Sequence, residues 1–168
     1  MKNFLKHAFL TLALLSLTAC GILDYIIPKG MMDFASPKGI KLDWDGVTIL
    51  AANDANLNSP VALDVVLLKD EASLNLLTTL PATKWFASRG ELEKTFPQVI
   101  SYKSFEVVPG QTLRVAATEF GSARVAGVLM YADYLTPGEH RIRVDQLQGA
   151  VSVQLGTRDF TVTAQPLK

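Results

Sequence analysis

Apolar and polar residues alternate in short stretches from residue 40 onward, and such alternation is typical of β-strands with one buried face. Ile40–Trp44 alternates in this way, and Val47–Ala51 continues as an apolar run after the turn-forming pair Asp45-Gly46. Val61–Leu68 has Asp64 as its only polar residue, which predicts a strand covered on most of both faces. Further predicted strands are Tyr102–Val108, Leu113–Ala117, Arg124–Tyr131, Arg141–Asp145, Val151–Leu155 and Phe160–Thr163.

Turn signals separate most of these predicted strands. Pro109-Gly110 follows one of them, and Gly156–Asp159 has the length of a four-residue hairpin loop. The sequence has no long alternation of strands and helices. The pattern therefore favours a mainly β domain, an antiparallel sandwich or barrel, over a fold in which helices join parallel strands.

The segment 71–97 interrupts the strand pattern, because its apolar residues show no period of two. Ser88-Arg89-Gly90-Glu91 matches a capping box, and Leu92 and Phe96 lie four residues apart on one helical face. Pro97 then limits the helix. We therefore expect one or two short helices between strands, with apolar residues that cap an open end or edge of the sheets.

The N-terminal residues 1–19 have the pattern of a secretory signal. Lys2 and Lys6 form a positive start, and an apolar stretch from Ala8 to Leu17 follows. The uncharged stretch is short for a membrane-spanning helix, which needs roughly 20 predominantly apolar residues. We therefore interpret residues 1–19 as a signal peptide.

The end of this segment, Leu17-Thr18-Ala19-Cys20, resembles the bacterial lipobox, in which a cysteine receives lipid before cleavage. Cys20 is the only cysteine, so an internal disulfide is excluded. The resemblance implies lipidation of Cys20; the alternative is a chance cysteine behind an ordinary signal peptide. Gly21 stands where lipoproteins of the inner membrane often carry Asp, which favours the periplasmic face of the outer membrane.

Removal of the signal changes the charge of the protein. The 168 residues contain 16 Lys and Arg against 16 Asp and Glu, and without Lys2 and Lys6 the remaining 149 residues have 14 basic and 16 acidic groups, a net charge of −2. A mildly acidic domain does not attract polyanions, so no nucleic-acid partner is expected.

Residues 20–39 are expected to tether a domain of residues 40–168 to the membrane. The segment contains the turn-forming triplets Pro28-Lys29-Gly30 and Pro37-Lys38-Gly39 but is rich in large apolar residues, which is unusual for a free linker. Two interpretations remain open, because the segment either lies against the lipid surface or packs along the domain.

Residues suited to catalysis or metal binding are few. His140 is the only histidine of the mature chain, and we interpret it as an exposed turn residue. Asp43 and Asp45 flank Trp44, but two carboxylates alone satisfy neither a glycosidase nor a calcium site. No P-loop, dinucleotide fingerprint or HExxH motif occurs. We predict no enzymatic activity, metal, cofactor or small-molecule substrate.

Two sets of side chains are candidates for binding. One set consists of Arg114, Arg124, Arg141 and Arg143. These arginines form either a basic strip or the ordinary solvent-exposed face of a sheet, where they pair with Glu119, Glu139 and Asp145. The other contains aromatic residues that serve either as interface anchors or in packing, namely Trp85, Tyr131 and Tyr134.

Four segments together carry a resemblance to a known family. They are a strand and Asn-containing loop at 47–60, the strand end Val66-Leu67-Leu68-Lys69-Asp70, the turn Val107-Val108-Pro109-Gly110-Gln111, and the stretch Ala123–Ala132 with the pattern A-x-x-x-G-V. In their order and spacing over residues 47 to 163, and with the lipobox, they resemble the outer-membrane lipoprotein of type VI secretion systems, called TssJ.

The resemblance implies a transthyretin-like, antiparallel two-sheet β-sandwich with a short helical insert at about 71–97. It also implies a structural role, in which the lipoprotein ties the secretion membrane complex to the outer membrane by binding the periplasmic C-terminal domain of an inner-membrane subunit. The family's loop between the first two strands contributes to that contact. The corresponding residues here are Asn53, Asp54, Asn56, Leu57, Asn58 and Ser59, with Asn56 and Asn58 as exposed amides.

Two other functions remain as alternatives. One is a pilotin, a chaperone-like protein or a binding lipoprotein of another envelope machine. The other is an envelope hydrolase built on Asp43 and Asp45.

Overall fold

The computed structural model describes residues 39–166. The predicted signal peptide, Cys20 and the predicted tether up to residue 38 lie outside the described residues. Among the helices that are described, none is both long enough and apolar enough to cross a membrane.

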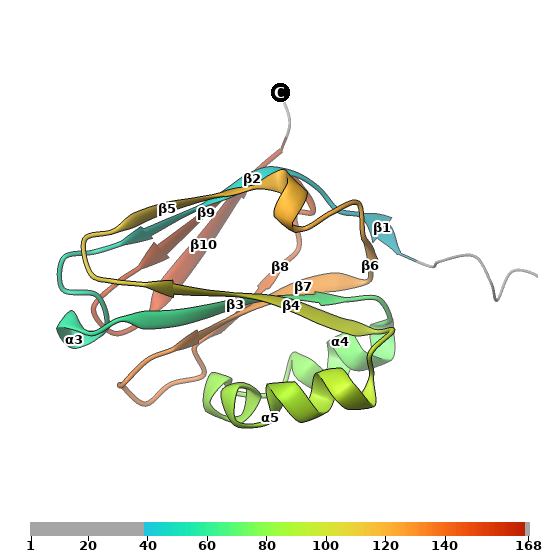
Figure 1. The fold of residues 1–168 in the computed structure, drawn as a ribbon, viewed down its shortest axis with the longest axis horizontal. Helices are drawn as coiled ribbons and strands as arrows, with labels where there is room; N and C mark the ends of the chain where they lie inside the picture. The colour runs from blue at the N-terminus through green and yellow to red at the C-terminus, as the bar shows by residue number, and fades with distance from the viewer. Residues whose placement is uncertain (1–38, 167–168) are drawn as a thin grey trace, which may run out of the picture. The chain divides into compact units, whose positions relative to one another are not determined.

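Two four-stranded sheets lie face to face, and a two-stranded ribbon lies beside them (Figure 1). One sheet has the order β10-β9-β2-β5, the other has the order β4-β3-β7-β8, and the ribbon pairs β1 with β6. Neighbouring strands are antiparallel except β2 and β9, which are parallel. The strands are β1 (Ile40–Lys41), β2 (Asp43–Ala51), β3 (Val61–Leu68), β4 (Ile100–Val107), β5 (Thr112–Ala116), β6 (Arg124–Val125), β7 (Gly127–Asp133), β8 (Arg141–Val144), β9 (Gln148–Leu155) and β10 (Phe160–Gln165). The predicted mainly β sandwich with a helical insert is confirmed.

The core between the sheets comes from the predicted alternation. In β9, and in β2 from Val47 onward, every second side chain is buried, and the buried set includes Ile49 and Val153. β3 is buried along almost its whole length, as its apolar sequence predicts, because the second sheet is covered on both faces. Side chains such as Leu63 and Val65 enter the core between the sheets, whereas Val66 enters a second core beneath the helices.

The prediction of a turn at Asp45-Gly46 is wrong, because β2 runs through this pair without ending. The pairing of β2 with β9 shifts its register between Trp44 and Gly46, so the pair forms a bulge. A Cβ atom at Gly46 would lie only 2.8 Å from the carbonyl oxygen of Val115 on β5. The glycine therefore permits close approach of the neighbouring strand.

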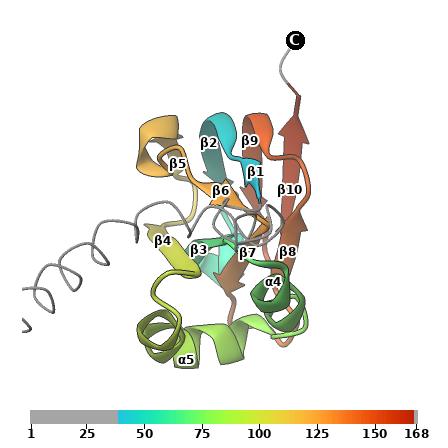
Figure 2. The same ribbon diagram turned by 90° about the vertical axis from the view of Figure 1, so that its right-hand side faces the viewer.

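Two helices, α4 (Glu71–Leu77) and α5 (Ala82–Thr95), form the predicted insert and lie below the second sheet in Figure 1. The side chain of Asp70 caps α4 by accepting a 2.8 Å hydrogen bond from the amide of Ser73. The predicted capping box at Ser88 is wrong, since α5 is continuous there and the Ser88 hydroxyl donates to the Lys84 carbonyl. The helices cover a sheet face, and not an open end or edge as expected (Figure 2).

A buried carboxylate fixes α5 to the sheet. Asp64 on β3 is fully buried, and its oxygens accept hydrogen bonds from Trp85 Nε1 at 2.8 Å and from Ser104 Oγ at 2.6 Å. Arg89 on α5 forms an ion pair with the same carboxylate at 2.6 Å. Two residues of α5 and one residue of the neighbouring strand β4 thus satisfy the buried charge of Asp64.

Trp85 and Tyr131 are packing residues of this second core and not interface anchors. Their rings stack with centroids 5.0 Å apart, and neither residue is exposed. The Tyr131 hydroxyl donates to the carbonyl of Leu77 at 2.6 Å. Burial raises the pKa of this hydroxyl above its ordinary value, so the group stays a donor that joins the end of α4 to β7.

We predict that Asp64→Asn lowers the free energy of unfolding by about 2–4 kcal/mol. The amide nitrogen would replace an oxygen that accepts hydrogen bonds, so a buried donor would face another donor. Asp133→Asn is the matched control, because Asp133 is exposed at the end of the neighbouring strand β7. Denaturant unfolding measures both variants, and equal midpoints would show that the carboxylate does not hold α5 in place.

Candidate functional site

Four loops meet at one end of the sandwich, at the left of Figure 1. They are the loop 52–60 between β2 and β3, the turn 108–111 between β4 and β5, the loop 134–140 between β7 and β8, and the hairpin 156–159 between β9 and β10. We call this end of the domain the loop end. It contains every residue of the predicted partner-binding loop.

Asn56 joins two of these loops through its side chain. Its Nδ2 donates to the carbonyl of Pro60 at 2.8 Å, and its Oδ1 accepts from the amide of Leu135 at 2.7 Å. The residue is only 2% exposed. The prediction that Asn56 offers an exposed amide is therefore wrong. The side chain turns inward because it satisfies polar backbone groups of both loops.

The backbone of the short helix α3 (Ala55–Asn58) is unusual. Three consecutive residues have positive φ, with values of 47° at Asn56, 55° at Leu57 and 64° at Asn58. Asn tolerates this left-handed region, whereas a leucine there costs on the order of 1 kcal/mol. The conformation leaves the Leu57 side chain 45% exposed. The fold thus holds an apolar side chain out of the loop despite the conformational cost.

The hairpin 156–159 holds the same loop from the other side. The Leu57 amide donates to the carbonyl of Thr157 at 3.2 Å, and the Asn56 amide donates to the carbonyl of Gly156 at 3.1 Å. Thr157 Oγ1 in turn donates to the Asp54 carboxylate at 2.6 Å. The predicted binding loop is therefore part of a cross-linked surface rather than a free loop.

His140 holds the loop 134–140 against the hairpin. Its Nδ1 lies 3.0 Å from the Asp159 carboxylate, and its Nε2 lies 2.8 Å from the carbonyl of Thr136. The ring stacks on Tyr134 and is 5% exposed, so the prediction of an exposed turn histidine is wrong. A Cβ atom at Gly138 would approach the ring to 2.6 Å, so this glycine leaves room for the imidazole.

Tyr134 is likewise a packing residue of the loop end. Its hydroxyl donates to the carbonyl of Asp159 at 3.0 Å. Burial first, and the nearby Asp159 carboxylate second, raise the pKa of this hydroxyl above its ordinary value. The neutral hydroxyl therefore adds a second link between the loop 134–140 and the hairpin.

The loop end gathers exposed apolar side chains. Among residues 39–166, seven large hydrophobic side chains are exposed, and three of them lie here, with Leu50 close by near the end of β2. The three are Leu57, Val108 and Leu135. Leu135 is 67% exposed, and its amide is bound to Asn56, next to Leu57. Rigid loops that present apolar side chains are typical of protein recognition sites.

The other residues of the predicted loop differ in exposure. Asn53, Asp54 and Asn58 are exposed, whereas Ser59 is half-buried. Leu135 was not among the predicted site residues. Its place beside Leu57 depends on the Asn56 side chain, which pairs positions 79 residues apart in the sequence.

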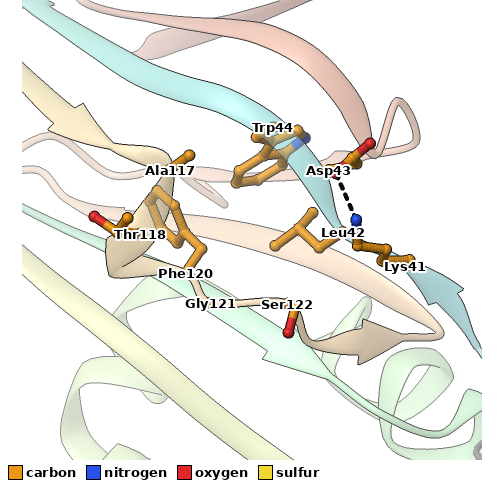
Figure 3. Close-up of a pocket in the computed structure, with 9 residues that line it drawn as sticks. All are labelled: Lys41, Leu42, Asp43, Trp44, Ala117, Thr118, Phe120, Gly121 and Ser122. Carbon is orange, nitrogen blue, oxygen red and sulfur yellow. Dashed lines mark hydrogen bonds and ion pairs between the residues drawn. The ribbon is translucent and has the colours of Figure 1, made fainter.

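The predicted acidic pair lies near the start of β2, away from the loop end. Asp43 and Asp45 are exposed on β2, and Asp43 forms an ion pair with Lys41 at 2.9 Å beside a pocket of about 340 Å³ (Figure 3). Trp44 and Phe120 close the wall of this pocket with ring centroids 5.4 Å apart. No group of three or more potential metal ligands is found within residues 39–166.

The four arginines do not form one strip, because they lie on different sheets. Arg141 and Arg143 on β8 form ion pairs with Glu139 and Asp145, as the alternative interpretation expects. Arg114 is exposed on β5 of the other sheet. Glu119 forms an ion pair with Lys103 and not with an arginine.

Solved structures with a similar fold come from type VI secretion systems. The T6SS lipoprotein TssJ1 from Pseudomonas aeruginosa is similar over 73% of this chain and 96% of that chain, with 16% identity and a TM-score of 0.54. A chain in a structure described as "Type VI membrane complex" is similar over 72% of this chain and 96% of that chain, with 18% identity and a TM-score of 0.52. Serratia marcescens Lip, described as a membrane bound component of the Type VI Secretion System, covers 71% of this chain and 96% of that chain, with 13% identity and a TM-score of 0.49. Neither the known family models nor the curated proteins yield a match to the sequence.

The fold and the loop end define a β-sandwich domain with helices on one sheet and a set of loops at one end that are joined by hydrogen bonds. Within that class, the chain has the fold of the TssJ lipoproteins, as the resemblance of its sequence motifs implied.

We predict that Asn56→Ala destabilises the domain by about 2–3 kcal/mol, because the carbonyl of Pro60 and the amide of Leu135 each lose a buried partner. Asn58→Ala is the matched control. Asn58 also has a positive φ, but it is exposed and its side chain forms no hydrogen bond within residues 39–166. Denaturant unfolding of both variants separates the effect of placing alanine at a positive φ from the effect of losing the hydrogen bonds of the Asn56 side chain. Equal losses would mean that the Asn56 side chain does not hold the loop end.

Proposed function

We propose that this protein is an outer-membrane lipoprotein and a structural component of the type VI secretion membrane complex. Its lipid on Cys20 holds it at the periplasmic face, and its loop end binds the periplasmic C-terminal domain of an inner-membrane subunit. The protein acts by binding and not by catalysis. It thereby ties the complex to the outer membrane.

The observation that carries this proposal is the loop end itself. Leu57 and Leu135 are exposed apolar side chains on loops whose backbones are fixed by Asn56, His140 and the hairpin 156–159. A rigid surface loses little conformational entropy on binding, so a modest apolar contact yields useful affinity. Exposed apolar anchors within a polar rim are the usual centre of a protein interface.

The similar structures support the choice of partner class. A sandwich of this fold is the T6SS lipoprotein TssJ1, and another belongs to a structure described as the Type VI membrane complex. The predicted binding loop, which follows the first long strand of the sandwich, supports the same partner because it lies within the loop end.

The direction of β2 supports the proposed arrangement in the envelope. The chain enters the domain at β1, immediately before Asp43, and the binding loop follows Ala51 at the other end of β2. A strand of nine residues spans about 30 Å. The loop end therefore points away from the place where the chain from the lipid anchor enters, which leaves it free to meet a partner in the periplasm.

The anchoring part of the proposal predicts the behaviour of Cys20→Ser. Without the thiol no lipid is attached, so the exported protein is expected in the soluble periplasmic fraction and type VI secretion is lost. Fractionation and a secretion assay measure the two effects. Normal secretion by a variant that is exported but not lipidated would exclude the anchoring role.

The binding part predicts that Leu57→Asp and Leu135→Asp each weaken binding at least about 10-fold, because a charge would be buried in an apolar contact. The probe is the periplasmic domain of the inner-membrane subunit, titrated against the mature chain made as Cys20→Ser. Leu76→Asp is the control, since Leu76 is 62% exposed on α4, on the helical face of the domain and outside the loop end.

A loss of binding in the Leu76→Asp control equal to that in Leu135→Asp would contradict a specific interface at the loop end. Recovery of an outer-membrane channel protein in place of the inner-membrane subunit would support the pilotin alternative. Thermal unfolding of all three variants checks that the domain stays folded.

A further inference from the structure

The four sheet edges of the sandwich differ in how they are protected. β8 is four residues long and contains two ion-paired arginines, and β4 contains Lys103 and Glu106. β5 contains Arg114. β10, the outer strand at the right of Figure 2, has the sequence FTVTAQ and no charged residue. Charges, bulges and short length normally prevent an edge strand from pairing further, and β10 has none of these devices over its six residues.

The register of the hairpin shows which backbone groups of β10 are free. The Gly156 amide donates to the carbonyl of Asp159 at 2.9 Å, so this pair is hydrogen-bonded across the hairpin. Hydrogen-bonded and non-bonded pairs alternate in an antiparallel ladder. Thr161 and Thr163 therefore bond to β9, whereas the backbone groups of Val162 and Ala164 point to the open edge. Within residues 39–166 no other strand pairs with this edge, although β8 of the other sheet comes close to β10.

A shallow groove lies beside the start of this edge, on the outer face of the sheet. Its volume is about 410 Å³, and it is lined by residues of β2, β9 and β10. Leu50, Gln154 and Thr161 form a row of cross-strand neighbours within it. A strand added to β10 would place an alternate side chain next to Thr161, at the margin of this groove, while Leu50 lies two strands further in on β2.

The open edge is continuous with the loop end. β10 follows directly from the hairpin 156–159, which is bonded to the predicted binding loop through Leu57 and Asp54. We propose that β10 accepts a strand from the same protein partner that binds the loop end, so this inference rests on the proposed function. The partner supplies an extended, uncharged segment of five or six residues, with one apolar side chain beside Thr161 at the margin of the groove.

The chemistry of β10 specifies this segment. Main-chain hydrogen bonds to Val162 and Ala164 give affinity without selecting side chains, and the groove selects an apolar side chain at one position. The exposed threonines of β10 offer no charge to pair with, so charged residues on the added strand would gain no cross-strand ion pair. Two copies of this chain joined at β10 in antiparallel fashion would hold their loop ends at opposite ends of the joint sheet. Because the β10 edge adjoins the loop end of the same molecule, a strand from the partner bound at that loop end is favoured over a second copy of this chain.

Residue-resolved hydrogen exchange of the mature chain, made as Cys20→Ser, tests the proposal directly. With the periplasmic domain of the inner-membrane subunit as probe, the amides of Val162 and Ala164 are expected to exchange at least about 10-fold more slowly in the complex. Those of Thr161 and Thr163 serve as internal references, because β9 already protects them. Unchanged exchange of Val162 and Ala164 in a complex that forms would overturn the strand addition.

Variants at the two edges of one sheet provide the second test. Thr163→Lys places a charge on β10, and Thr112→Lys places the same charge at an exposed position of β5. We expect a loss of affinity of about 10-fold for the first and no loss for the second. Ala164→Pro, which removes an outward amide without breaking a bond to β9, should also weaken binding.

The outcomes separate this inference from the proposed function. If Leu135→Asp abolishes binding and Thr163→Lys does not, the loop end binds the partner and the strand addition is wrong. If both variants bind the inner-membrane domain as the unchanged protein does, both proposals fail. Slower exchange at Val162 in the protein alone, dependent on its concentration, would assign the edge to a second copy and overturn the partner strand.

Discussion

One buried carboxylate decides which side of the sandwich is closed. Asp64 has no exposed surface and is satisfied by Trp85 and Arg89 of α5, together with Ser104 of β4. Since a buried charge without partners is strongly unfavourable, α5 must lie on the outer face of β4-β3-β7-β8. The two helices of the insert therefore cover this sheet, while neither of them packs on the outer face of β10-β9-β2-β5 (Figure 2). The open sheet, its edge at β10 and the loop end are therefore left uncovered by these helices.

The loop end is likewise held by buried polar side chains whose hydrogen-bond partners lie elsewhere in the sequence. Asn56 satisfies the backbone of two loops with one amide, and His140 places one ring nitrogen against Asp159 of the neighbouring hairpin and the other against the Thr136 carbonyl of its own loop. These polar contacts allow the loops to be rigid without an apolar core of their own. As a result, the apolar side chains of Leu57 and Leu135 remain at the surface, where they are available for binding. Polar side chains thus hold the frame, and apolar side chains form the proposed contact.

The local pattern of the sequence predicts the strands well and the site only in part. Alternation identifies the strands of both sheets, and the single polar residue of Val61–Leu68 correctly indicates a strand covered on both faces. The partners of Asp64 lie 21 to 40 residues away, so local pattern cannot reveal them. Asn56 and His140 were predicted to be exposed because loop polarity suggests solvent, yet their partners come from other loops. Asp45-Gly46 has the composition of a turn, but the approach of β5 makes it a bulge.

The central claim is that the loop end, and not the helical face, meets an inner-membrane subunit of the secretion system. Photo-crosslinking in living cells tests it most directly, with a photoreactive amino acid placed at Leu135 or at Leu76 of the lipidated protein. These positions are similarly exposed, at 67% and 62%, but lie on the loop end and on α4 respectively. The account predicts a crosslink from position 135 to the inner-membrane subunit and none from position 76. A crosslink to that subunit from position 76 alone would contradict it.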